Sequence, residues 1–481
     1  MEMRVLIVNT SERTGGAAVA AGRLMEALNS LSLGEGRKEN GVKAKMLVRD
    51  KQTNRLTVVR HPAQRKLRWM FLWERLMIWI RLRFRRKHLF NIDTGQCGAD
   101  ITQLAEFQEA DIIHLHWINQ GMLSLKQIRK ILDSGKRVVW TMHDIWPATA
   151  VCHLTAPPPA SPGGGGEDPL PTSPRGGEGN CRKFEKECGD PLPTSPRGGE
   201  ICPHLGLARQ VWRKKQQMLE GRHVTFVACS EWLAGEARKS ALLKGQNVLS
   251  IPNPIDTRLY QPGDKKAARK ILGLPEEGKM ILFVAQRATN PYKGMQYLTP
   301  LLSPEGDINV SRAESIVSPS GDNRGGTFLG VIGKTPSNSP YLGGEQDPPP
   351  TPPRRGGGLP FYPLGYFSDE KRMVLAYQAA DVFVLPSLSE NLPNTIMEAM
   401  ACGVPCVGFN VGGIPEEIDH LKTGYVAAYR DAKDLARGLH WVLEEADHEA
   451  LSKACVQKVA TCYSQQSVAR KYLEAYGISD K

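Results

Sequence analysis

The chain has 481 residues and a formal net charge of +12. Hydrophobic residues make up 41% of it, which is enough to form the hydrophobic cores of globular domains. This length favours two domains, and the positive charge favours a polyanionic partner or a membrane surface. No run approaches the roughly 20 apolar residues of a membrane-spanning helix. The first residues lack the pattern of a signal peptide, and the ten cysteines are scattered, so we expect a reduced, cytoplasmic protein.

Short Pro/Gly/Ser-rich repeats interrupt the chain. The segment DPLPTSPRGGE occurs twice, identically, and two degenerate copies accompany it. Such tracts cannot bury a core, and insertions into loops cost little free energy because closure entropy grows only logarithmically. We therefore interpret them as disordered insertions at about 156–179, 190–200 and 335–360.

Between the insertions, apolar β-branched stretches alternate with amphipathic ones, in two series. The expected strands are 4–10, 111–117, 137–144, 224–230, 280–287, 327–333, 362–366, 381–387 and 404–409, and the expected helices are 17–30, 123–135, 231–245, 369–380 and 394–403. This alternation predicts an α/β protein with two Rossmann-like domains, each built on a parallel sheet, and a cleft between them.

The proline-rich segment 251–262 suggests the boundary between the two series. We expect an N-terminal domain at 1–252, a C-terminal domain at 253–450, and a helical segment at 451–481 that packs back on the N-terminal domain. In open α/β sheets, ligands bind at the carboxyl ends of the strands.

Two glutamates, Glu390 and Glu398, follow one of these strands at a spacing of eight. Glu390 lies in the turn after the strand, and Asn394 or Thr395 lies near the start of the next helix. A helix N-terminus offers free amides and a positive dipole end, which suits a phosphate. Glu398 lies about one turn into the helix, where a carboxylate can accept hydrogen bonds from vicinal hydroxyls such as those of a ribose. By itself this spacing also fits two ordinary surface acids.

Two cations follow the first strand of the second series. Arg287 and Lys293 are six residues apart and flank a turn that contains Pro291. Cations at a strand end can neutralise a diphosphate leaving group, whose charge develops in the transition state. The alternative is a solvated basic loop.

The stretch LPSLSENLPNTIMEAMACGVPCVGFNVGGIPEEI resembles the nucleotide-sugar site of retaining glycosyltransferase family 4, which has the two-domain GT-B architecture. The resemblance implies that Glu390 contacts the transferred sugar and Glu398 the ribose, and that the backbone at Asn394 and Thr395 approaches the diphosphate. It also implies that Arg287 and Lys293 replace a catalytic metal. We expect no cofactor beyond a UDP- or GDP-sugar donor.

Further candidates are glycines and histidines at strand ends. Gly15 and Gly16 lie between a strand and a helix, where a ligand or a plain tight turn is expected. Gly412 and Gly413 resemble the family's second glycine loop near the sugar. The carboxylates that follow, Glu416 and Glu417, are expected on the first turn of a helix, where they complement its dipole.

His143 ends a strand, where it could contact a sugar hydroxyl or pack in the core. His114 and His116 share one face of a strand, which fits core packing and acceptor contact equally.

Four cysteines come together when the repeats are removed. Cys188 and Cys202 then form a CxxC pair, and Cys152 and Cys181 lie nearby. Such spacing resembles a structural zinc knuckle, and unlinked thiols are the alternative.

Residues 60–90 hold ten Arg or Lys, interleaved with large apolar side chains, and a single acid, Glu74. This pattern predicts an amphipathic helix on an anionic membrane surface. A helix packed on its own domain is the alternative. Nucleic acid is not expected as a partner, because no binding motif accompanies the basic residues.

These observations together predict a retaining glycosyltransferase of the hexosyltransferase type. It would move a sugar from a nucleotide-diphosphate donor to a glycan or polyprenyl-linked acceptor, in cell-surface polysaccharide synthesis at the inner face of the cell membrane. The alternatives are another GT-B enzyme, such as a phosphorylase or sugar epimerase, and a catalytically inactive membrane-associated binding protein.

Overall fold

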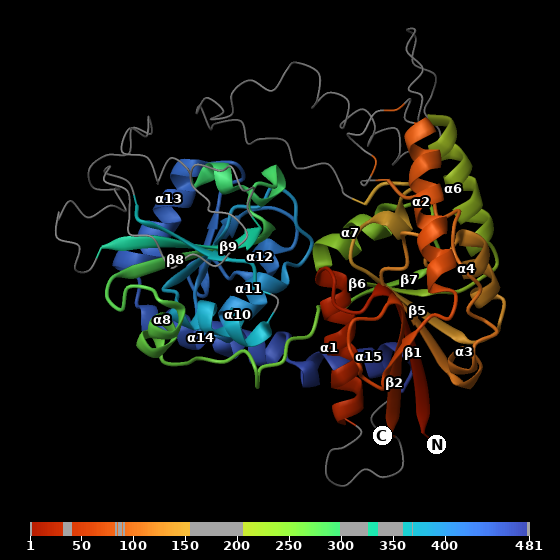
Figure 1. Cartoon of the computed structure of the whole chain (residues 1–481), viewed down its shortest axis with the longest axis horizontal. Coiled ribbons are helices and arrows are strands. Elements are labelled where there is room, and N and C mark those ends of the chain that lie inside the picture. Colours follow the sequence, from red (N-terminus) through yellow and green to blue (C-terminus); the bar gives the residue numbers. More distant parts are fainter. Residues whose placement is uncertain are drawn as a thin grey trace. The chain divides into compact units, whose positions relative to one another are not determined.

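The computed structural model describes residues 2–31, 41–81, 84, 89, 92–153, 205–298, 326–334, 359–367 and 369–478. The chain forms two compact units (Figure 1). Of the described residues, the first unit contains those up to 153, 205–254 and 465–478, and the second contains those from 255 to 464. The predicted insertions lie outside the described residues, apart from positions 359 and 360.

The first unit is built on a seven-stranded sheet with the order β3-β2-β1-β4-β5-β6-β7. Every recorded strand pair in it is parallel. Its strands are β1 (Met3–Ser11), β2 (Val42–Asp50), β3 (Val58–Arg60), β4 (Ile112–Leu115), β5 (Arg137–Met142), β6 (Thr225–Ala228) and β7 (Asn247–Ser250).

Helices pack on both faces of this sheet. They are α1 (Gly16–Leu31), α2 (Gln64–Arg81), α3 (Ala105–Glu109), α4 (Leu125–Leu132), α6 (Leu205–Leu219), α7 (Glu231–Lys239) and α15 (Gln465–Ala475), with a 3₁₀ turn at Trp146–Ala148. Helix α15 is the last described helix, but it lies against α1, the first helix of the chain (Figure 1).

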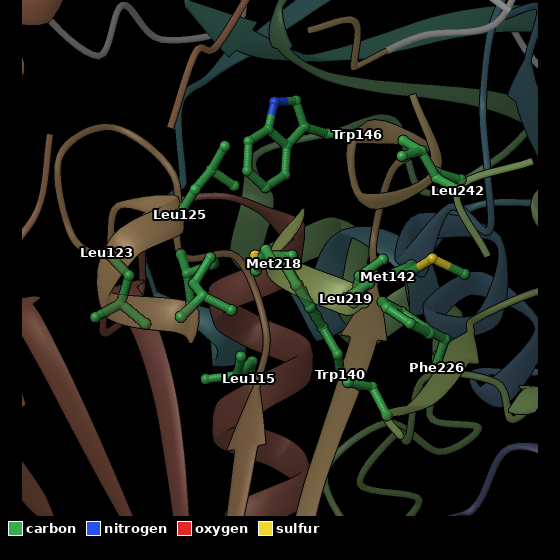
Figure 2. Close-up of a cluster of buried hydrophobic side chains, with 14 of the residues drawn as sticks. Leu115, Leu123, Leu125, Trp140, Met142, Trp146, Met218, Leu219, Phe226 and Leu242 are labelled. Atoms are coloured by element: carbon green, nitrogen blue, oxygen red, sulfur yellow. The ribbon is translucent and has the colours of Figure 1, made fainter. Parts of the chain in front are cut away.

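The alternation of side chains along β1 divides the core of the first unit into two clusters. Leu6 and Val8 belong to one cluster, and Val5 and Ile7 to the other, because successive side chains of a strand point to opposite faces. The first cluster is rich in aromatic rings; Figure 2 shows Trp140 and Phe226 grouped within it, and their rings stack with centroids 5.6 Å apart.

The second unit repeats this architecture with a six-stranded parallel sheet in the order β10-β9-β8-β11-β12-β13. Its strands are β8 (Lys279–Arg287), β9 (Thr327–Lys334), β10 (Phe361–Gly365), β11 (Val382–Leu385), β12 (Cys406–Phe409) and β13 (Gly424–Ala427). Its helices are α8 (Lys265–Leu272), α10 (Glu370–Ala379), α11 (Asn394–Ala401), α12 (Ile414–Glu417), α13 (Ala432–His440) and α14 (His448–Cys462). Short 3₁₀ turns lie at Pro291–Lys293 and Met295–Tyr297, and a π-helical turn at Trp441–Glu445.

The predicted fold class, two α/β domains with parallel sheets, is confirmed. The C-terminal segment predicted at 451–481 is divided between the units: α14 lies in the second unit against α11, and α15 lies in the first. Among the described residues, no helix is long and apolar enough to span a bilayer.

Candidate active site

The order of the second sheet creates a point where the chain direction across the sheet reverses. Strands β8 and β11 are neighbours, but the chain passes through β9 and β10 on one side before it returns to β11 on the other. The loops after β8 and β11 therefore leave the sheet side by side at their carboxyl ends. This topological switch point is where open α/β sheets bind ligands. Arg287 and Lys293 follow β8, and Glu390 follows β11.

Lys293 and Glu390 form an ion pair between these two loops, from the Lys293 Nζ to Glu390 Oε1. The Glu390 side chain is 13% exposed and the Lys293 side chain 31%, so both groups remain accessible to a ligand. The 3₁₀ turn that carries Lys293 starts with Asn290, whose side-chain oxygen accepts a hydrogen bond from Tyr292 N. The backbone of Tyr292 in turn accepts a hydrogen bond from Leu388 N, 2.8 Å away, which joins the two loops directly.

Two glycines hold the loop after β11 from opposite sides. Gly294 has φ +77°, and a Cβ at this position would lie 1.7 Å from the Pro386 carbonyl oxygen. Gly412 has φ +59°, and its Cβ would lie 1.8 Å from the Glu390 carbonyl oxygen. Gly413 N donates to Asn391 O at 2.8 Å. Both close approaches need glycine, so the position of Glu390 depends on these turns.

Helix α11 begins directly after this loop. Its N-cap residue is Pro393, which makes no side-chain capping hydrogen bond, and Asn394 and Thr395 form its first turn. Glu398 is buried on this helix, and its Oε2 accepts a hydrogen bond of 2.9 Å from the Tyr377 hydroxyl of α10. Burial and the Glu398 charge raise the pKa of Tyr377 well above its ordinary value, so Tyr377 stays a hydrogen-bond donor.

Arg287 ends β8 next to an irregularity in the strand pairing and is exposed. Of the four charged residues singled out at this site, the structure brings Lys293 and Glu390 into direct contact. It records no ion pair between Arg287 and any other described residue. Glu398 contacts Tyr377 instead.

Glu417 is an unexpected feature of this region. It lies with Glu416 on the first turn of α12, as the sequence suggested, but its side chain is fully buried and neither carboxyl oxygen has a partner among the described residues. Burial, and then the nearby charge of Glu390, raise the pKa of Glu417 well above its ordinary value. Burial therefore favours the neutral form of Glu417 and works against a role for it as an anion at the helix dipole. In the sequence, Glu416 and Glu417 are simply two adjacent acids, and this pattern does not indicate that one of them is buried.

Three histidines of the first unit lie close together, with His114 and His116 buried and His143 half-buried. His143 Nε2 and His116 Nδ1 share a hydrogen bond of 3.0 Å, and burial lowers the pKa of His143 to about 4. His114 is a core residue, because its ring nitrogens bond to the Tyr476 and Thr141 hydroxyls at 2.7 and 2.8 Å. At neutral pH these rings are uncharged.

Asp144 lies beside this cluster and connects three aromatic residues. Its Oδ2 accepts from Trp117 Nε1 at 3.1 Å and is 2.7 Å from His153 Nδ1, and its Oδ1 accepts from Trp146 N. Burial alone would lower the pKa of His153, but the negative charge of Asp144 and the hydrogen bond to it raise this pKa. The sequence gave no role to His153.

The glycines of the first unit form an exposed turn between β1 and α1. Gly15 has φ +92° with open space around a Cβ, and Gly16 begins α1. Ala18 N and Val19 N both donate to the Gly15 carbonyl, so this glycine completes the first turn of the helix.

The candidate zinc ligands are described only in part. Cys152 is buried at a bridge between Ile92 and Cys152, and Cys181, Cys188 and Cys202 lie outside the described residues. Within the described ranges, no group of three or more His, Cys, Asp or Glu side chains could hold a metal.

Comparison with known proteins shows what this chain is similar to. Residues 364–458 match the model of the family "Glycosyl transferases group 1". D-inositol 3-phosphate glycosyltransferase 2 of Catenulispora acidiphila is 30% identical over 197 residues, 41% of this chain and 42% of that protein. N-acetyl-alpha-D-glucosaminyl L-malate synthase of Bacillus anthracis is 33% identical over 98 residues, 20% of this chain and 26% of that protein. The chain thus matches less than half the length of these curated relatives.

Solved structures match along the whole chain but with low identity, and so bear on the fold alone. Sucrose-phosphate synthase from Thermosynechococcus elongatus has a TM-score of 0.57 at 16% identity and covers 99% of this chain and 98% of its own. HepE of Anabaena, solved in complex with UDP, has a TM-score of 0.53 at 12% identity, with 99% and 100% covered. The family model and the relatives confirm the predicted resemblance to glycosyltransferase family 4, and the solved structures share the two-domain fold.

Proposed function

We propose that the chain is a retaining glycosyltransferase that moves a hexose from a nucleoside-diphosphate sugar to a hydroxyl of a glycan or lipid-linked acceptor. The observation that carries this proposal is the contact between Lys293 and Glu390 in front of the N-terminus of α11. It brings a cation, a carboxylate and a helix N-terminus together at the switch point of the sheet, which are the groups that a sugar diphosphate requires.

In the reaction, the bond between the anomeric carbon and the diphosphate oxygen breaks, and the acceptor oxygen bonds to the same carbon. The proton of the acceptor hydroxyl passes to the departing diphosphate. The departing nucleoside diphosphate gains negative charge at that oxygen. Lys293 and Arg287, with the first amides of α11 around Asn394 and Thr395, stabilise this charge, and no catalytic metal is required.

The two glutamates have separate roles in this proposal. Glu390 accepts hydrogen bonds from sugar hydroxyls, and entry of the donor replaces its contact with Lys293 by contacts of each group with the ligand. Glu398, held by Tyr377, accepts from the ribose. Gly412 and Gly413 keep the loop of Glu390 in place near the sugar. In the first unit, Gly15, Gly16 and His143 are the proposed contacts to the acceptor.

The donor is proposed to be a UDP-sugar. HepE of Anabaena, which shares the fold, was solved with UDP, and this supports a uridine nucleotide over a guanosine nucleotide. The acceptor is proposed to be a growing cell-surface polysaccharide or its lipid-linked precursor, on the cytoplasmic side of the membrane.

The test is a transfer and donor-hydrolysis screen with UDP- and GDP-sugars on the wild-type chain and the Glu390→Gln variant. We expect release of the nucleoside diphosphate by the wild-type chain and its loss in the variant, with nucleotide affinity unchanged. Phosphate-dependent cleavage of a glycan without any nucleotide would instead identify a phosphorylase. Nucleotide binding without turnover of any donor would identify an inactive binding protein.

A further inference from the structure

Helix α2 of the first unit has two apolar faces, although only one of them is packed. Leu67 and Ile78 are buried against the domain, together with the charged pair Glu74 and Arg75. The opposite face is open to solvent and carries Trp69, Leu72, Trp73, Leu76, Met77 and Ile80, which are 73%, 55%, 60%, 41%, 36% and 44% exposed. At 100° per residue, these six side chains form one stripe about 140° wide, centred opposite Ile78.

Such a stripe is unusual on a monomer, because single exposed apolar residues are common but contiguous ones are not. Two of its members are tryptophans, whose rings favour the boundary between water and lipid. We define the outward face of α2 as these six side chains.

The charges around the outward face have one sign. The exposed charged residues of α2 are Arg65, Lys66, Arg68 and Arg81, all cationic. The acid of the helix, Glu74, is buried and accepts a hydrogen bond from the Thr94 hydroxyl. The outward face therefore presents apolar side chains that can insert into a lipid layer, and the cations around it attract anions.

The inner face fixes the helix in one orientation. A Cβ on Gly121 would lie 3.0 Å from Phe71 N, so the backbone of α2 packs directly on the loop after β4. The Arg49 guanidinium lies over the Phe71 ring at 5.6 Å and donates to Gln120 O. Arg68 reaches Asp50 at the end of β2.

These contacts join α2 to the carboxyl ends of β2 and β4, which is the edge of the sheet where ligands of the first unit are expected. A surface that covers the outward face would therefore lie near that ligand edge (Figure 1, α2 in orange).

We propose that the outward face of α2 binds an anionic phospholipid bilayer, with Trp69 and Trp73 at the level of the headgroups, and that the acceptor is presented by a lipid in that bilayer. A second copy of the chain is a poorer occupant, because a two-fold contact would bring the same four cations of each copy together. Nucleic acid would leave the leucine, methionine and isoleucine side chains in water. The lipid-linked acceptor rests on the proposed function, whereas the membrane contact does not.

The test is sedimentation of the full chain with vesicles of phosphatidylcholine alone and with an added third of phosphatidylglycerol. We expect binding to the anionic vesicles that is weakened by salt, and weak binding to the neutral ones. The Trp69→Ser/Trp73→Ser variant should bind at least tenfold more weakly, and Arg65→Gln/Lys66→Gln should lose most of the salt-dependent part. The matched control is Ile271→Ser, at an exposed apolar position on α8 that is 67% exposed, which should bind like the wild-type chain.

Circular dichroism and UDP titration of each variant in solution separate this inference from the proposed function. All five exposed positions can be changed without disturbing the core, so UDP binding should be unchanged. Equal vesicle binding by the wild-type chain and the double tryptophan variant would overturn the inference, as would no vesicle binding at all. A dimer in size-exclusion chromatography that disappears in the same variant would overturn it in favour of a protein partner.

Discussion

Gly412 and Glu390 approach each other so closely that a Cβ at position 412 would lie 1.8 Å from the Glu390 carbonyl oxygen. The two residues come from different loops, after β12 and β11, and Gly412 also has φ +59°, where side chains are strained. The position of the candidate sugar-binding carboxylate is therefore set by a glycine that carries no chemistry of its own.

Gly412→Ala should displace this loop and reduce transfer strongly, with a loss of about 1–3 kcal/mol of stability from backbone strain and the close contact. Gly245→Ala is the matched control, because Gly245 has φ +84° but nothing within 4 Å of a Cβ. It should cost about 1 kcal/mol and leave transfer intact. Initial rates with the donor and urea unfolding measure both effects, and equal activity in the two variants would contradict the role given to Gly412.

Tyr377→Phe should weaken donor binding. It removes the hydrogen bond from the Tyr377 hydroxyl, which orients the Glu398 carboxylate, so we expect KM for the donor to rise about tenfold, equivalent to about 1.4 kcal/mol. Tyr425→Phe removes a hydroxyl that donates to Asp434 at the same distance of 2.9 Å and serves as control. A change in kcat with an unchanged KM would argue against ribose binding by Glu398.

Glu417→Gln should stabilise the protein at alkaline pH. The pKa of Glu417 is raised in the folded state, so its folded form holds a proton that the unfolded chain releases above pH 4.5. The stability that protonated Glu417 contributes is thus fully present below pH 4.5. As pH rises toward the pKa of the folded state, the free energy of unfolding loses this contribution at about 1.4 kcal/mol per pH unit. Between pH 5 and 8 the unfolding free energy of the variant should therefore fall less steeply than that of the wild-type chain. Parallel pH profiles of the two would show that Glu417 is not held neutral.

Tyr476→Phe tests how the end of the chain supports the first unit. The Tyr476 hydroxyl of the segment after α15 is hydrogen-bonded to the buried His114 ring, 362 residues away in sequence. Its loss leaves one ring nitrogen without a partner and should cost about 1–3 kcal/mol. Thermal unfolding followed by near-ultraviolet circular dichroism measures this, with the exposed Tyr366→Phe as control. Equal melting temperatures would show that the bond does not stabilise the fold.

The fold class could be predicted because buried parallel strands and amphipathic helices leave a direct pattern in the sequence. The strand 280–287 and the helix 394–403 agree with β8 and α11 to within two residues. Strands β2, β3, β7 and β13 were missed: β2 has alternating lysines, and the other three are short and not fully buried. Within the basic stretch 60–90, the described helix is α2. The sequence could not show which of its two apolar faces packs on the domain and which is open to solvent.

The charged residues of the candidate site were identified from motif spacing, but their contacts were not. The sequence showed that Lys293 and Glu390 each follow a strand. That the two strands are neighbours is known only from the sheet order, and the ion pair depends on the turns at Gly294 and Gly412. The contact of Tyr377 with Glu398 could not be predicted, because a tyrosine in an amphipathic helix is common and does not indicate a functional role. The division of the C-terminal segment between α14 and α15 depends on long-range packing, which no local pattern reports.

Calorimetric titration of the full chain with UDP and GDP tests the central claim most directly, that the Lys293 and Glu390 loops with the start of α11 bind a nucleoside diphosphate. We predict saturable binding of one equivalent, tighter for UDP, that is retained in Glu390→Gln and weakened at least tenfold in Lys293→Gln. A folded wild-type chain that binds neither nucleotide, or a Lys293→Gln variant that binds as tightly as the wild-type chain, would contradict it.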